Sequence, residues 1–135
     1  MFEDLEGLDA PGALAAAAER RRCADAAEAE LLWLAAHWAD LHAVLSGQGD
    51  GVGARVVVPG MERLLRLAGP GTPEVAEFAP AELGAALGMS TFAASCLVGD
   101  ALELRHRLPR LWGRVLDGTL AAWRARRVAD HTKIL

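Results

Sequence analysis

Aromatic side chains are scarce in this 135-residue chain, and tyrosine is absent. Phenylalanine and tryptophan make up only 5% of the residues, whereas 53% are hydrophobic, most of them alanine, leucine and valine. A core without large aromatic anchors favours helices, because alanine and leucine are strong helix formers that pack at close range. The length is that of one ordinary domain, and it is sufficient to bury a substantial core.

Cysteines and long apolar runs are also few. The two cysteines, Cys23 and Cys96, form no CxxC pair, and we expect both to be reduced thiols. The most apolar window, residues 31–45, is too short to span a bilayer and contains Asp40. The first nine residues are acidic, which is unlike a secretory signal or a transit peptide. The sequence therefore predicts a soluble, cytoplasmic protein.

Motifs that carry catalytic or metal chemistry are missing. No HExxH motif is present, and neither histidine nor cysteine occurs at zinc-ligand spacing. The segment around Ser90 is not a GxSxG elbow, and no GxxxxGK[ST] follows the glycines near residue 70. We therefore predict no catalytic residue, no cofactor and no metal site, including at the four histidines, His37, His42, His106 and His131.

A long helix is predicted from about residue 10 to residue 45, with Asp9 as its N-cap and Pro11 in its first turn. Its apolar residues can be read as heptads, and we expect this seam to be buried within the monomer. A second interpretation is that the seam joins a second copy or a partner helix. The seam consists of Ala24, Ala27, Leu31, Leu34, Trp38, Leu41 and Leu45, and the last five would form the partner contact.

The remainder of the chain is predicted to be a glycine-rich, flexible linker over residues 46–60 and a helical core over 61–135. We expect a short helix over 61–68, a helix from Pro80 to a left-handed turn at Gly88, and a helix capped by Ser90 that runs from Thr91 to Arg107. A helix after Pro109, a turn at Gly118 and a last helix complete the pattern. The side chains expected to pack in the core include Phe78, Phe92, Leu97, Leu102, Leu104, Trp123 and Val128.

This pattern predicts an all-α fold of about five or six helices in a single domain of residues 1–135. One long N-terminal helix would pack on a C-terminal part that resembles a helical hairpin or a helix-turn-helix. The start of the longer helix in that unit, STFAASCLVGD, contains no Arg, Lys, Asn or Gln. Direct reading of DNA bases by this helix is therefore not expected.

Charge is divided unevenly along the chain. The net charge is −4, but residues 105–135 carry +6 and residues 1–104 carry −10. The basic third could contact phosphates without sequence preference. The other interpretation is that the two oppositely charged parts attract each other, or that they attract another domain.

Four segments together resemble the actinobacterial domain of unknown function 222, which typically precedes an HNH endonuclease domain in the same polypeptide. They are GTPEVAEF at 71–78, ELGAALG at 82–88, RLPRLW at 107–112 and GTLAAWRAR at 118–126. The likeness covers roughly residues 31–135. It implies a helical domain without chemistry of its own, and the nuclease motif would lie downstream of residue 135.

The sequence thus leads to two functional hypotheses. The first is a non-catalytic helical accessory domain that contacts DNA non-specifically through its basic C-terminal third. The second is a helical interaction or dimerisation module that binds no nucleic acid. The residues expected at a DNA contact are Arg110, Arg114, Arg124, Arg126 and Arg127.

Overall fold

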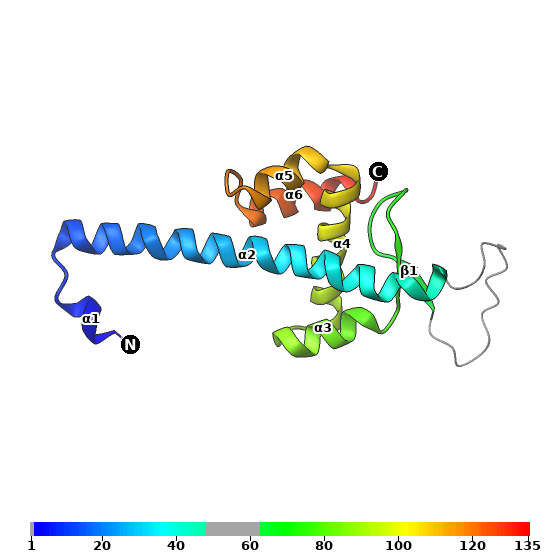
Figure 1. Cartoon of the computed structure of the whole chain (residues 1–135), viewed down its shortest axis with the longest axis horizontal. Helices are drawn as coiled ribbons and strands as arrows, with labels where there is room; N and C mark the ends of the chain where they lie inside the picture. The colour runs from blue at the N-terminus through cyan, green and yellow to red at the C-terminus, as the bar shows by residue number, and fades with distance from the viewer. Residues whose placement is uncertain (1, 48–62) are drawn as a thin grey trace.

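The computed structural model describes residues 2–47 and 63–135, without the side chains of 44–47. The fold is all-α, with 72% helix, as the sequence predicts. Figure 1 shows one long helix that passes beside a compact group of shorter ones. The described elements are α1 (Glu3–Glu6), α2 (Ala10–Gly47), β1 (Leu64–Arg66), β2 (Glu74–Ala76), α3 (Ala79–Leu87), α4 (Thr91–Arg107), α5 (Pro109–Leu116) and α6 (Ala122–Thr132).

Helix α4 lies at the centre of the group and contacts α2, α3, α5 and α6. Every residue from Leu97 to Leu104 is buried, so this part of the helix is covered on all sides. Helix α4 begins at Thr91 and ends at Arg107, as predicted. Ser90 caps its start by accepting a hydrogen bond from the Ala93 N–H at 3.1 Å. Phe92 was expected in the core, and this is wrong: it lies ahead of the covered segment and is 78% exposed.

The connection before α4 also follows the prediction. Pro80 lies in the first turn of α3, and Gly88 ends that helix with a positive φ of 70°. The two helices meet at 107°, which is within the range of helix-turn-helix units. In the described segments, no single helix is both long and apolar enough to cross a membrane. The bent pair of α3 and α4 meets this test only when its two helices are taken together.

The buried stripe of α2 differs from the predicted seam. Leu34 and Leu41 are 51% and 56% exposed, and Ala24 and Ala27 are exposed as well, so the expectation that the seam is buried is wrong for these four residues. The stripe that packs on α4 is offset by one residue and is made mainly of alanine, which allows the two helices to approach closely. Leu45 lies outside the described side chains. The buried residues of this stripe are Leu32, Ala35, Ala36 and Ala39.

The N-terminal half of α2 extends away from the other helices, as Figure 1 shows. Asp9 caps it as predicted, since its carboxylate accepts a hydrogen bond from the Gly12 N–H at 2.8 Å. No residue between 10 and 28 is buried, and Leu14 is largely exposed. We call residues 10–28 the projecting segment.

The predicted helix over 61–68 is wrong where the chain is described. Residues 64–66 form a strand that pairs antiparallel with β2, with Leu65 opposite Val75. Prolines and glycines at 69–73 cannot continue a helix, and they turn the chain back so that the two short strands pair. Val75 is buried, whereas Phe78 is exposed, so the expectation that Phe78 packs in the core is wrong. Most of the predicted linker over 46–60 lies outside the described residues, although α2 itself continues through 46–47.

The segment after β1 approaches α4 at Gly99. A Cβ at this position would lie 2.4 Å from the carbonyl oxygen of Leu67. Real contacts of this kind are not that short, and the obstacle is backbone that cannot rotate away. Only glycine therefore allows α4 and this segment to pack at the observed distance.

Gly99→Ala should lower the free energy of unfolding by about 1–3 kcal/mol, because the added methyl group forces the two backbones apart. Gly113→Ala is the matched control, since Gly113 also lies in a helix but nothing is within 4 Å of its would-be Cβ. That change should raise the free energy of unfolding by up to about 1 kcal/mol through helix propensity alone. Urea unfolding followed by tryptophan fluorescence measures both. Equal stabilisation by the two changes would contradict the packing argument.

Candidate nucleic-acid interface

The eight cations of residues 105–135 fall into two groups. Four form ion pairs: Arg105 with Asp40 at 2.6 Å, Arg107 with Glu103 at 2.9 Å, and Arg126 and Lys133 with Asp100 at 2.7 and 2.6 Å. The other four form no ion pair with any residue that the structure describes, and they are Arg110, Arg114, Arg124 and Arg127. Half of the cations in residues 105–135 are therefore paired within the fold.

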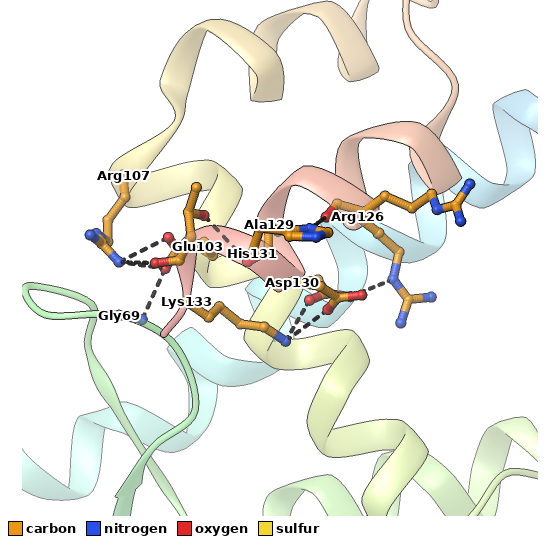
Figure 2. A network of polar contacts seen from close by, with 11 residues as sticks. Gly69, Glu103, Arg107, Arg126, Ala129, Asp130, His131 and Lys133 are labelled. Carbon is orange, nitrogen blue, oxygen red and sulfur yellow. Dashed lines mark hydrogen bonds and ion pairs between the residues drawn. The ribbon is translucent and has the colours of Figure 1, made fainter. Parts of the chain in front are cut away.

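Asp100 connects α4 to the C-terminal end of the chain. Its carboxylate is 1% exposed and lies between the Arg126 guanidinium and the Lys133 ammonium. Lys133 also contacts Asp130 at 3.2 Å (Figure 2). Burial raises the pKa of Asp100 above its ordinary value, although the hydrogen bonds from Lys133 and Arg126 act in the opposite direction.

Glu103 lies one turn further along α4 and is completely buried. It accepts a hydrogen bond from the Gly69 N–H at 2.9 Å and two from Arg107, at 2.9 and 3.2 Å (Figure 2). Arg107 also donates to the Thr132 carbonyl at the end of α6 at 3.0 Å. Burial alone would raise the pKa of Glu103, but its hydrogen bonds to Thr132, Gly69 and Arg107 outweigh that effect and lower it.

We call Asp100, Glu103, Arg107, Arg126 and Lys133 the carboxylate network. The sequence-based assignment of Arg126 to a DNA contact conflicts with its place here, since its Nε is hydrogen-bonded to a buried carboxylate. The two carboxylates were not identified from the sequence. The signal that could have found them is a pair of acidic residues three apart within the apolar run LVGDALEL, which places both on one side of a buried helix.

The exposed side of α6 combines arginine with tryptophan. The guanidinium carbons of Arg124 and Arg127 lie 5.3 and 6.0 Å from the centre of the Trp123 ring. Trp123 is 53% exposed, so the expectation that it packs in the core is wrong. The buried side of α6 consists of Ala122, Ala125 and Ala129, and the expected core residue Val128 is also largely exposed. We call Trp123, Arg124 and Arg127 the α6 basic face.

The two arginines of α5 lie on the neighbouring helix. Arg110 and Arg114 are four residues apart, and so they share one side of α5, where both are exposed. Thr119 donates its hydroxyl and its N–H to Asp117, which lowers the pKa of that carboxyl, and the nearby Arg114 adds to the effect. Since α5 packs against α6, one helical hairpin carries all four arginines that form no ion pair with the described residues (Figure 1). Of these, Arg114 donates a hydrogen bond from its Nε to the Thr119 hydroxyl at 3.4 Å.

Helix α4 is placed where a helix-turn-helix would have its DNA-reading helix, but its surroundings do not allow that role. A reading helix must expose one side to the major groove. The middle of α4 is covered on all sides, and its exposed first turn, residues 90–92, contains no long polar side chain. Any DNA contact must therefore use another element.

The histidines are placed in separate environments. His37 stacks on Trp33 with ring centres 5.1 Å apart, and His42 lies against Trp38 with ring centres 4.0 Å apart. The Nδ1 atom of His131 lies 2.8 Å from the Arg127 carbonyl oxygen. Within residues 2–47 and 63–135, no three histidine, cysteine, aspartate or glutamate residues come together as a metal site would require.

The division of the cations predicts different effects for two arginines in one helix. Arg126→Gln should lower the free energy of unfolding by about 1–3 kcal/mol, because it removes a charge-assisted hydrogen bond from a buried carboxylate. Arg124→Gln should change it by less than about 0.5 kcal/mol, because an exposed side chain contributes little. Thermal unfolding of both variants provides the comparison. A similar loss in the two would show that Arg124 also has a partner inside the fold.

The two buried carboxylates should affect acid stability with opposite signs. The pKa of Asp100 is raised, so its contribution to stability is present below its unfolded pKa of about 3.9 and is lost as the pH rises through the folded pKa. The pKa of Glu103 is lowered, so its contribution is present above its unfolded pKa of about 4.3 and is lost as the pH falls through the folded pKa.

Unfolding of the wild type, Asp100→Asn and Glu103→Gln is measured at several pH values between about 3 and 6. The stability of the wild type relative to Asp100→Asn should fall as the pH rises. Its stability relative to Glu103→Gln should increase over the same range. Two difference curves of the same slope would contradict the assignment of opposite shifts.

Comparison of the chain with models of known families, with curated proteins and with solved structures gave no match. The resemblance to the domain of unknown function 222 accordingly stays a prediction from the four sequence segments. The feature of this chain that bears most directly on function is the set of arginines that form no ion pair with the described residues, Arg110, Arg114, Arg124 and Arg127.

Proposed function

We propose that this chain is a non-catalytic, cytoplasmic helical accessory domain that contacts DNA without sequence preference through the α5–α6 hairpin. The observation that carries the proposal is the α6 basic face, where two arginines without an ion pair in the described chain flank an exposed tryptophan. Arg110 and Arg114 on α5 extend the positive charge, and Arg126 is withdrawn from the contact because it belongs to the carboxylate network.

The chemistry of this face suits the sugar–phosphate backbone. Guanidinium groups bind phosphate oxygens through paired N–H donors, and the indole ring offers a flat surface on which an unstacked base can lie. A stacking contact of this kind tolerates any base, because every base has an aromatic face. The proposal therefore includes no sequence specificity, in agreement with the covered position of α4.

The net charge of −4 limits the strength of the interaction. Long-range attraction to DNA is weak for an acidic chain, so the contact depends on local positive charge within about one Debye length, roughly 8 Å at physiological salt. We expect non-specific affinity with a dissociation constant of roughly 10⁻⁴–10⁻⁶ M at physiological salt. By the resemblance, cleavage of DNA would reside in a downstream HNH domain and not in these residues.

The test is fluorescence anisotropy with labelled 20-nucleotide probes, single-stranded and duplex, of unrelated sequence, over a range of salt concentrations. Arg124→Gln/Arg127→Gln should weaken binding to every sequence alike and reduce the salt slope by up to about two units, one for each lost phosphate contact. Trp123→Ala should weaken single-strand binding more than duplex binding, because only an unpaired base can stack on the ring.

The matched control is Arg63→Gln/Arg66→Gln, which removes the same amount of positive charge from two exposed residues at β1, outside the α5–α6 hairpin. It should leave the salt slope unchanged. Equal effects of the two double variants would show that only net charge matters, and binding that is absent from the wild type would end the proposal.

A further inference from the structure

The projecting segment of α2 is largely uncovered, and its last two turns, from Arg22 on, line a groove beside the turn between α5 and α6. Its 19 residues extend for about 28 Å at 1.5 Å per residue, and none of them is buried. Most helical stability in proteins comes from packing, and this segment has little of it. Leu14 is 75% exposed on this segment, where it contacts no core.

A groove of about 680 Å³ begins where the projecting segment reaches the other helices. One wall is α2 itself, with Ala26, Trp33 and Leu34, and the other is the turn between α5 and α6, with Leu116 and Leu120. Trp33, Leu34 and Leu116 are each about half exposed, so the groove presents apolar surface to solvent. Its α2 wall also carries three charged residues, Arg22, Asp25 and Glu30, and the opposite wall carries Asp117.

We propose that this groove is occupied by a second copy of the chain. The α2 helices of two copies pack antiparallel about a two-fold axis at Ala26, so that the projecting segment of each copy lies in the groove of the other. The projecting segment and the groove adjoin each other along α2, so a single symmetric contact covers both surfaces of both copies at once. The small side chain at the axis allows the two helices to approach closely.

The charges support a second copy as the occupant. In an antiparallel pair about Ala26, facing residue numbers add to the same total, so Arg22 of each copy lies opposite Glu30 of the other. Ala18 in the same way lies opposite Leu34. Arg22 and Glu30 of the groove are thus each paired with the opposite charge of the partner. The existing contact of Arg22 with Glu19 is exposed on both sides and contributes little that would oppose the exchange.

Light scattering coupled to size exclusion, with the full chain at roughly 1–100 µM, measures the state directly. The mass should rise toward twice 14.3 kDa with concentration. Ala26→Glu should leave a monomer, because two carboxylates would meet at the axis. Ala24→Glu is the matched control: Ala24 is also exposed, but it lies about 200° around the helix from Ala26, and it should leave the dimer intact. Circular dichroism confirms that both variants stay helical.

Charge reversal identifies the partner surface. Arg22→Glu should raise the dissociation constant of the dimer by at least about tenfold, because it then faces Glu30. Arg22→Glu/Glu30→Arg should return it to within about threefold of the wild type. A chain that stays monomeric, a dimer insensitive to Ala26→Glu, or a reversal that the second change does not restore would each overturn the proposal. The α6 basic face takes no part, so DNA binding and dimerisation are tested separately.

Discussion

Two carboxylates inside a helix that is covered on every side determine how the rest of this chain must be arranged. Asp100 and Glu103 cannot keep their charge in the interior without cations or N–H donors beside them. Those partners come from the β1–β2 segment, from the end of α4 and from the end of α6. The carboxylate network therefore fastens two other parts of the chain to α4, the segment at Gly69 and the end of the chain from α6 onward, and its loss would leave two buried charges unpaired.

This requirement also separates the cations that hold the fold from those available to a partner. Arg126 and Arg127 are neighbours in sequence, yet one points to a buried carboxylate and the other lies near an exposed tryptophan ring. Successive residues of a helix point about 100° apart, so a run such as RARR supplies both sides of α6. The cations of the C-terminal third thus have two roles. Some pair with carboxylates inside the fold, and only the exposed ones are available to bind a partner.

The sequence predicted local features well and long-range ones poorly. Asp9, Gly88 and Ser90 were identified from backbone chemistry that depends on a few adjacent residues, and the structure confirms the conformations they were expected to give. The buried side of α2 was predicted wrongly, because leucine was assumed to be buried before alanine. Which side is buried depends on how closely α4 approaches, and no local pattern contains that distance.

The candidate interface shows the same limit. The unpaired arginines were all named from the sequence, but so was Arg126, since its partner Asp100 lies 26 residues away in the chain. The sequence predicts a helix over residues 61–68, whereas the pairing of residues 64–66 with residues 74–76 makes that part of the chain a strand. In both cases the missing information is a contact between distant segments.

The length of α2 has an electrostatic consequence of its own. Helix α1 carries the acidic residues Glu3, Asp4 and Glu6. If a flexible segment joined α1 to the rest of the chain, these residues could bind the α6 basic face and block it. The projecting segment is a rigid rod of about 28 Å that is several Debye lengths long at physiological salt. It holds the acidic end away from the arginines (Figure 1). The long helix therefore keeps the acidic residues of α1 apart from the α6 basic face.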